Sequence, residues 1–117
     1  MSDGIKIEIV TPSEMLFTES VDMVVIPGSE GFFGVLPRHA ATLASLQRGR
    51  VDIYNNGSIT RRFFIDGGVA DVLPERVIIL AERAVDLDAV SVQQLEEQAV
   101  NGTQSESSFV NAVKDAV

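Results

Sequence analysis

The sequence contains no cysteine and only one histidine, His39. Without cysteine the chain has no disulfide, no thiol nucleophile and no thiolate to bind a metal. One histidine among scattered carboxylates does not make a structural zinc site, and no acidic loop has the spacing of a calcium-binding EF-hand. The composition therefore predicts no metal and no other cofactor, and it is compatible with a reducing compartment.

Positive charge is also scarce, with 9 lysines and arginines against 17 acidic residues and a formal net charge of -8. Nucleic acids and anionic membrane surfaces attract clustered cations, so this balance argues against direct binding to either. No apolar run approaches the roughly 20 residues of a membrane-spanning helix. The N-terminus has the pattern of neither a secretory signal nor a transit peptide, so we expect the chain to work where it is made.

Residues up to about 84 have the pattern of an all-β domain. Ile5–Val10 alternates apolar and charged residues, which is typical of a half-buried strand. The sequence Asn56-Gly57 stands between two strand-like runs, 51–54 and 59–65, and predicts a hairpin because both turn residues tolerate a positive φ. Many short strands separated by turn residues predict a β-sandwich or barrel.

Residues 28–40 read Gly-Ser-Glu-Gly-Phe-Phe-Gly-Val-Leu-Pro-Arg-His-Ala, and we interpret them as one long loop between strands. Phenylalanines in such a loop must either pack beneath it or face a partner, so the loop is a candidate binding surface. It lacks the Gly-Lys-Ser/Thr ending of a phosphate-binding loop, and no helix is expected after it. A nucleotide phosphate site is therefore not predicted here.

His39 is the only candidate for a catalytic base. Ser29 lies near it in the sequence, and Asp66 or Asp71 could orient it, but the Gly-x-Ser-x-Gly turn of many hydrolases is missing. The residues favour a binding or coupling module without catalytic residues. A small His39-dependent hydrolase is the alternative.

Two dipeptides within the predicted strands also need an explanation. Gly67-Gly68 predicts a strand crossing or a bulge. Arg61-Arg62 is either a solvated strand edge or a contact to an acidic partner.

The composition changes after Ala84. Residues 85–117 lack proline and carry a net charge of -5, from six acidic residues and one lysine. Apolar residues recur there at helical spacing, first at Val92, Leu95 and Ala99 and then at Phe109, Val113 and Ala116. We therefore predict a β-domain over 1–85 and a short helical hairpin over 86–117. Each helix has about three turns, too few to persist alone in water. A free-standing ligand sensor that uses this hairpin is a further hypothesis.

Several motifs resemble those of the epsilon subunits of bacterial and chloroplast F-type ATP synthases. They are Gly28-Ser29-Glu30-Gly31, Gly34, Pro37, His39-Ala40, Leu43, the block 67–72, and the run 77–84 that leads into Asp88. The resemblance covers roughly residues 5–88. It implies a mainly β fold, a ten-stranded β-sandwich followed by the helical hairpin.

The resemblance also implies a role in the central stalk of the rotary motor. Such a subunit binds the gamma subunit and the c ring, and it couples rotation driven by proton flow to ATP synthesis. It is peripheral at the cytoplasmic face of the bacterial inner membrane and touches the membrane only through the ring. By this resemblance we expect contacts to the c ring from Glu30, Gly31, Phe32, Phe33 and His39.

In family members that bind ATP, the first helix carries the motif Ile/Leu-Asp-x-x-Arg-Ala. Leu87 and Asp88 match it, but Ser91 replaces the arginine, so we predict weak or absent ATP binding. The family's second helix can reach the catalytic head and inhibit ATP hydrolysis. Here Lys114 is its only cation, beside Asp115 and the nearby Glu106, so we predict weak inhibition.

Overall fold

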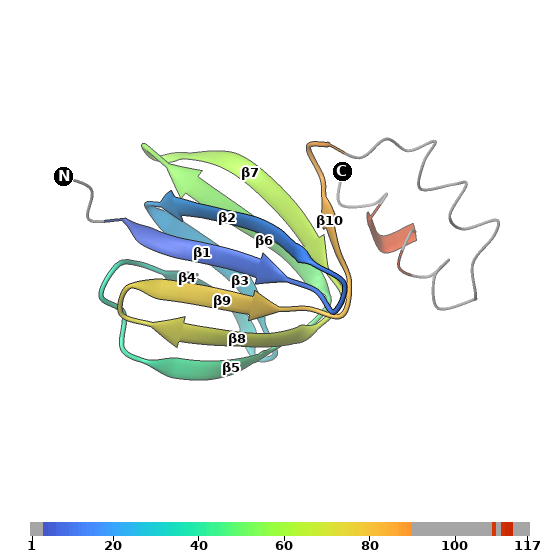
Figure 1. Ribbon diagram of the computed structural model, residues 1–117, viewed down its shortest axis with the longest axis horizontal. Coiled ribbons are helices and arrows are strands. Elements are labelled where there is room, and N and C mark those ends of the chain that lie inside the picture. Colours follow the sequence, from blue (N-terminus) through green and yellow to red (C-terminus); the bar gives the residue numbers. More distant parts are fainter. Residues whose placement is uncertain (1–3, 90–108, 110, 114–117) are drawn as a thin grey trace.

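The computed structural model describes residues 4–89, 109 and 111–113. Ten strands occupy most of the first range, which confirms the mainly β, ten-stranded fold (Figure 1). The strands are β1 (Ile5–Val10), β2 (Met15–Val21), β3 (Met23–Gly28), β4 (Gly31–Val35), β5 (Thr42–Leu46), β6 (Gly49–Asn55), β7 (Ser58–Ile65), β8 (Gly68–Leu73), β9 (Arg76–Leu80) and β10 (Ala84–Asp86).

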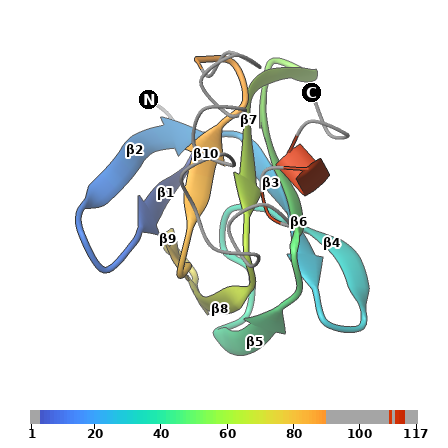
Figure 2. The same cartoon turned by 90° about the vertical axis from the view of Figure 1, so that its right-hand side faces the viewer.

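The strands form one continuous sheet that folds into two layers. Its order is β10-β7-β6-β3-β5-β8-β9-β1-β2, and β4 pairs with β3. β3 and β5 share only the pair Gly28–Leu46, so the sheet bends there into a layer β10-β7-β6-β3-β4 and a layer β5-β8-β9-β1-β2. Viewed from its end, the molecule shows the two layers facing each other (Figure 2).

The core lies between the two layers and follows from the alternation within each strand. In β1, for example, Ile5, Ile7 and Ile9 are fully buried, whereas Lys6 and Glu8 lie on the outer side. Since side chains alternate across a strand, each strand contributes one apolar row to the interior. Seventeen buried residues make up this core, and Phe63 is the largest of those that are almost fully buried.

The turn chemistry of the β6–β7 hairpin agrees with its sequence. Asn56 and Gly57 have φ values of 54° and 79°, and Asn55 pairs with Ser58 across the turn. Two consecutive positive φ values match the right-handed twist of the flanking strands, which is why Asn-Gly is favoured there. The predicted hairpin is confirmed.

Gly68 lies where the backbone of β8 approaches that of β9 closely. A Cβ atom at this position would lie 2.1 Å from the carbonyl oxygen of Leu80, and φ is +127°. Only glycine fits both constraints. The second glycine of the predicted pair is therefore required by this close approach, whereas the regular pairing of β8 with β5 and β9 shows neither a strand crossing nor a bulge there.

The interpretation of residues 28–40 as one loop was wrong. A two-residue turn, Ser29-Glu30, is followed directly by β4, which pairs with β3 from Gly31 to Val35. The glycines hid this strand from the sequence pattern, although Phe32, Phe33 and Val35 are residue types that strands favour. Only residues 36–41 form a loop.

The described part of the tail docks on the outer side of β7. Phe109 and Val113 are buried against Phe64 and Leu87 in a small apolar cluster, and residues 109 and 111–113 are helical. Phe109 and Val113 thus share a buried face as predicted, and Ala116, the third residue predicted on that face, lies outside the described residues. The predicted helix with Val92, Leu95 and Ala99 lies outside the described residues. The predicted boundary between residues 85 and 86 falls within β10.

Candidate functional site

The residues predicted to contact a c ring follow one edge of the sandwich instead of clustering in a loop. Glu30 and Gly31 lie at the β3–β4 turn, and His39 lies in the loop beyond the other end of β4. Phe32, on β4 itself, is 63% exposed on the outer side of its layer. Phe33 is half-buried and packs against the core.

Backbone contacts hold the two ends of this edge against the other layer. Gly28, beside the β3–β4 turn, pairs with Leu46, and Leu46 pairs with Gly68 at the start of β8. In the loop 36–41, the Arg38 N–H donates to the carbonyl oxygen of Pro74, just beyond the end of β8, at 2.7 Å. The turn and the loop are therefore separated by the length of β8, and a partner that contacts both must span the edge.

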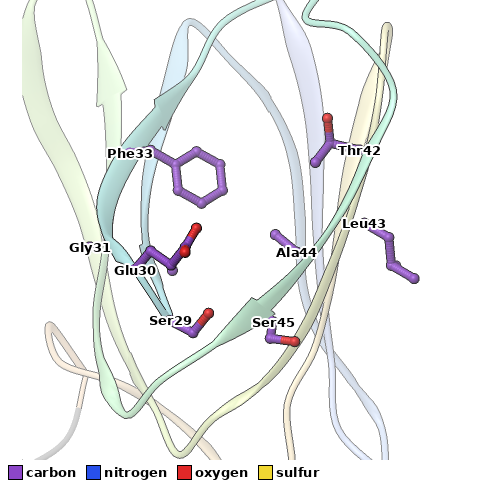
Figure 3. Close-up of a pocket in the computed structure, with 9 residues that line it drawn as sticks. Ser29, Glu30, Gly31, Phe33, Thr42, Leu43, Ala44 and Ser45 are labelled. Carbon is purple, nitrogen blue, oxygen red and sulfur yellow. The ribbon is translucent and has the colours of Figure 1, made fainter.

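An open groove of about 340 Å³ lies along this edge, between β4 and β5 (Figure 3). The Phe33 ring and the Glu30 side chain extend from the β4 side toward β5, whereas Leu43 points away from the groove. Within the described part of the chain, the Glu30 carboxylate has no ion-pair partner. The groove thus combines an aromatic wall with an unneutralised negative charge.

A row of apolar side chains crosses the outer face of the other layer. Val69 pairs with Leu80, Leu80 with Val10, and Val10 with Met15, so the row runs directly across β8, β9, β1 and β2. Leu80 and Met15 are 49% and 54% exposed. A groove of about 420 Å³ with mostly apolar walls runs beside the row and includes Pro12. Apolar surface of this kind marks an interaction site when it is contiguous.

The strand patterns carried a signal for this row. Val10 follows the buried Ile9 at the end of the otherwise alternating β1, and Leu80 ends the unbroken apolar run 77–80 of β9, after the buried Ile79. One residue of each pair must face out. The row as a whole required the register between strands far apart in the sequence.

Arg61 and Arg62 hold the beginning of the tail onto β7. The Arg61 guanidinium forms an ion pair with Asp86 and lies over the Phe17 ring, 4.7 Å from its centroid. The Arg62 N–H donates to one carboxylate oxygen of Asp88 at 2.9 Å, and its guanidinium donates to the other at 3.0 Å. Both arginines therefore bind acids of the same chain, a role that neither interpretation of the basic pair included.

The contacts of Arg62 also lower the pKa of Asp88, the carboxylate whose position resembles part of an ATP-binding motif. Desolvation raises the pKa of Asp88, but the hydrogen bonds and positive charge of Arg62, with a smaller contribution from Arg61, outweigh it. The pKa of Asp88 is therefore below its ordinary value. Leu87 is buried in the cluster with Phe64, and Ser91 lies outside the described residues. Asp88 is already committed to Arg62, so a nucleotide would have to displace that arginine.

The structure does not bring together the residues of the hydrolase alternative. Ser29 lies at the β3–β4 turn, whereas His39 lies at the other end of that edge, where its Nδ1 is 2.9 Å from the Ala40 carbonyl oxygen. Asp66 forms an ion pair with Arg48 at 2.8 Å. Among residues 4–89, 109 and 111–113, no group of histidines and carboxylates could hold a metal ion. In the same residues, no helix is both long and apolar enough to cross a membrane.

The fold and its surfaces define a class: a small β-sandwich with an apolar row across one outer face and a groove that contains Glu30 at one edge. The family model "ATP synthase, Delta/Epsilon chain, beta-sandwich domain" matches residues 4–87. The chain belongs to this family, and its sandwich is that of a non-catalytic ATP synthase subunit.

Curated relatives agree with this assignment, and a solved structure shares the fold. The ATP synthase epsilon chain of Rhodospirillum rubrum is 43% identical over 91 residues, which cover 78% of this chain and 68% of the relative. The epsilon chain of Rhodospirillum centenum is 44% identical over 92 residues, 77% of this chain and 63% of the relative. A chain in the mitochondrial ATP synthase of Euglena gracilis has the same fold, with a TM-score of 0.68 and 20% identity over 97% of this chain and 76% of that one.

Proposed function

We propose that the chain is a rotor subunit in the central stalk of a bacterial F-type ATP synthase and couples c-ring rotation to ATP synthesis. The observation that carries this proposal is the family match over the whole sandwich, together with relatives named ATP synthase epsilon chain. A chain in a central stalk and c-ring structure from Tetrahymena thermophila has a similar fold, with a TM-score of 0.61. The subunit has no catalytic role of its own in this proposal.

The gamma subunit would bind the apolar row of Val10, Met15, Val69 and Leu80. The fully buried centre of a protein interface is more apolar than its rim, because burying apolar surface stabilises the association. The row and its groove form such a centre on an otherwise acidic molecule. Three of these side chains, Met15, Val69 and Leu80, are exposed and Val10 is half-buried, and a contiguous apolar patch of this kind marks a surface that a partner covers.

The c ring would contact the edge that runs from Glu30 to His39. Glu30 and the exposed Phe32 combine a carboxylate with an aromatic anchor, a pairing that suits polar loops on a partner. Since this edge is as long as β8, the contact would be extended. Because the c ring would be its link to the membrane, the subunit would sit at the cytoplasmic face of the inner membrane and reach the membrane only through the ring.

The tail would contribute little to nucleotide sensing or to inhibition at the catalytic head. Asp88 is held by Arg62 and is not free to bind a nucleotide. The net charge of -5 over residues 85–117 opposes docking onto acidic segments of that head.

Co-purification tests this function directly. A tagged copy expressed in its source cells should bring down the gamma subunit and the c ring, and ATP synthase depleted of its epsilon subunit should regain proton-driven ATP synthesis when the chain is added back. Leu80→Glu should weaken this binding strongly. Ile59→Glu is the matched control, because Ile59 is 40% exposed but lies at the start of β7, away from the apolar row.

Two results would count against the rotor function. A hydrolytic activity of the isolated chain that His39→Ala abolishes would support the enzyme. In a coupling subunit the same substitution would remove one contact to the c ring and leave the binding of the gamma subunit intact. Failure to associate with any ATP synthase subunit would contradict the rotor function.

A further inference from the structure

Strands β2, β4, β5 and β10 form the edges of the two layers, and they are protected to different degrees. β2 contains a charged residue, Glu19, and its partner β1 has a register shift between Ile9 and Val10. β10 is only three residues long. Charges, irregularities and short length keep natural edge strands from pairing with other chains. β4 and β5 contain no charged residue and no proline, and both border the groove of Figure 3.

Pro27 determines which backbone groups of β4 face the open edge. Proline has no N–H, so the pair Pro27–Phe32 cannot exchange two hydrogen bonds. Hydrogen-bonded and non-bonded pairs alternate along antiparallel strands, so the N–H and C=O groups of Phe32 and Gly34 point away from β3. Among the described strands, none pairs with this side of β4. Two donors and two acceptors are thus available for a ladder.

We propose that an extended segment of a partner subunit adds to the open edge of β4 as a further strand and places a lysine or arginine near Glu30. Main-chain hydrogen bonds to Phe32 and Gly34 would provide affinity, and the charge would provide specificity. A basic residue is indicated because the Glu30 side chain extends into the groove and has no ion-pair partner among the described residues.

A second copy of this chain is a poor occupant of the edge, because each copy carries a net charge of -8. This proposal deepens the proposed function and rests on it, because the added strand would come from another subunit of the ATP synthase. The geometry of the edge does not depend on that function.

Gly34→Pro and Gly34→Ala form a matched pair of variants. Both add a Cβ, whose nearest neighbour would be the Met23 sulfur at an ordinary 3.5 Å. Only proline removes the outward N–H, and the bonds between β4 and β3 do not use that group. Binding is measured for the full-length chain on ATP synthase depleted of its epsilon subunit. We expect the alanine variant to bind within about twofold of the unchanged chain and the proline variant to bind about tenfold more weakly, because a partner carbonyl loses its donor.

Equal binding by the two variants would overturn the added strand. Hydrogen–deuterium exchange of residues 31–35 in the unchanged chain gives a second measure that requires no variant. We expect exchange to slow on assembly, and unchanged exchange rates would also overturn the proposal. Glu30→Lys should weaken binding more than Glu30→Gln. Equal effects of the two substitutions would show that the partner places no basic residue near Glu30. If the unchanged chain does not bind the depleted enzyme at all, the rotor function itself fails.

Discussion

Gly68→Ala should destabilise the sandwich severely. The added Cβ would lie 2.1 Å from the Leu80 carbonyl oxygen, in a backbone conformation with φ of +127°. Strain in that conformation costs about 1–3 kcal/mol. Forcing apart two paired strands adds about 1–3 kcal/mol. A total near 4 kcal/mol is a large part of the roughly 5–15 kcal/mol that stabilises an ordinary domain.

The assay is thermal unfolding followed by circular dichroism. A loss of about 4 kcal/mol lowers the midpoint by about 15–30 °C in a domain of this size. Gly67→Ala is the control, because its φ of +71° is strained but its Cβ would meet only the Leu46 carbonyl oxygen at 3.6 Å. That variant should lose about 1–2 kcal/mol. Midpoints within a few degrees of each other would refute the steric argument.

Three further outcomes are expected. Phe109→Ala removes the ring that packs on Phe64 and destabilises this cluster by about 3 kcal/mol. Hydrogen–deuterium exchange of the Leu87 amide should therefore become faster, while the amides of β1 are unaffected. Unchanged exchange at Leu87 would contradict the docking of Phe109 on the sandwich. The lowered pKa of Asp88 stabilises the fold above the unfolded-state value of about 3.9, and this contribution disappears as the pH falls through the folded-state pKa. Asp88→Asn should therefore flatten the acid side of the stability profile, and an unchanged profile would show that its bonds to Arg62 contribute nothing. Calorimetric titration of the full chain should detect no ATP binding, and a sub-millimolar dissociation constant would refute the reasoning from Asp88 and Ser91.

Local patterns in the sequence predict most of the sandwich. The alternation in Ile5–Val10 and the Asn56-Gly57 turn each depend on a few neighbouring residues, and both are present in the structure. β4 was missed because Gly31 and Gly34 interrupt its pattern, while the pairing that forms it comes from β3. Tertiary pairing overrides weak local preference for strands.

The candidate site could be predicted only in part, because it depends on register. The apolar row joins Val10 to Leu80, 70 positions apart, and no local pattern links these two residues. The Arg62–Asp88 contact likewise needs the β7–β10 pairing. Charge signs alone left Arg61-Arg62 open to two interpretations, and neither included an acid of the same chain.

The position of β1 has a consequence for how the chain is made. β1 pairs with β9 in parallel, so Ile7 meets Val77 after most of the domain has been synthesised. Until then, β1 can pair only with β2, and the apolar face of that hairpin has nothing to cover it. Contacts between residues so far apart in sequence slow folding and prolong the exposure of aggregation-prone edges. β1 is thus among the last strands to gain its second neighbour, and one face of the β1–β2 hairpin stays uncovered until β8 and β9 have been made.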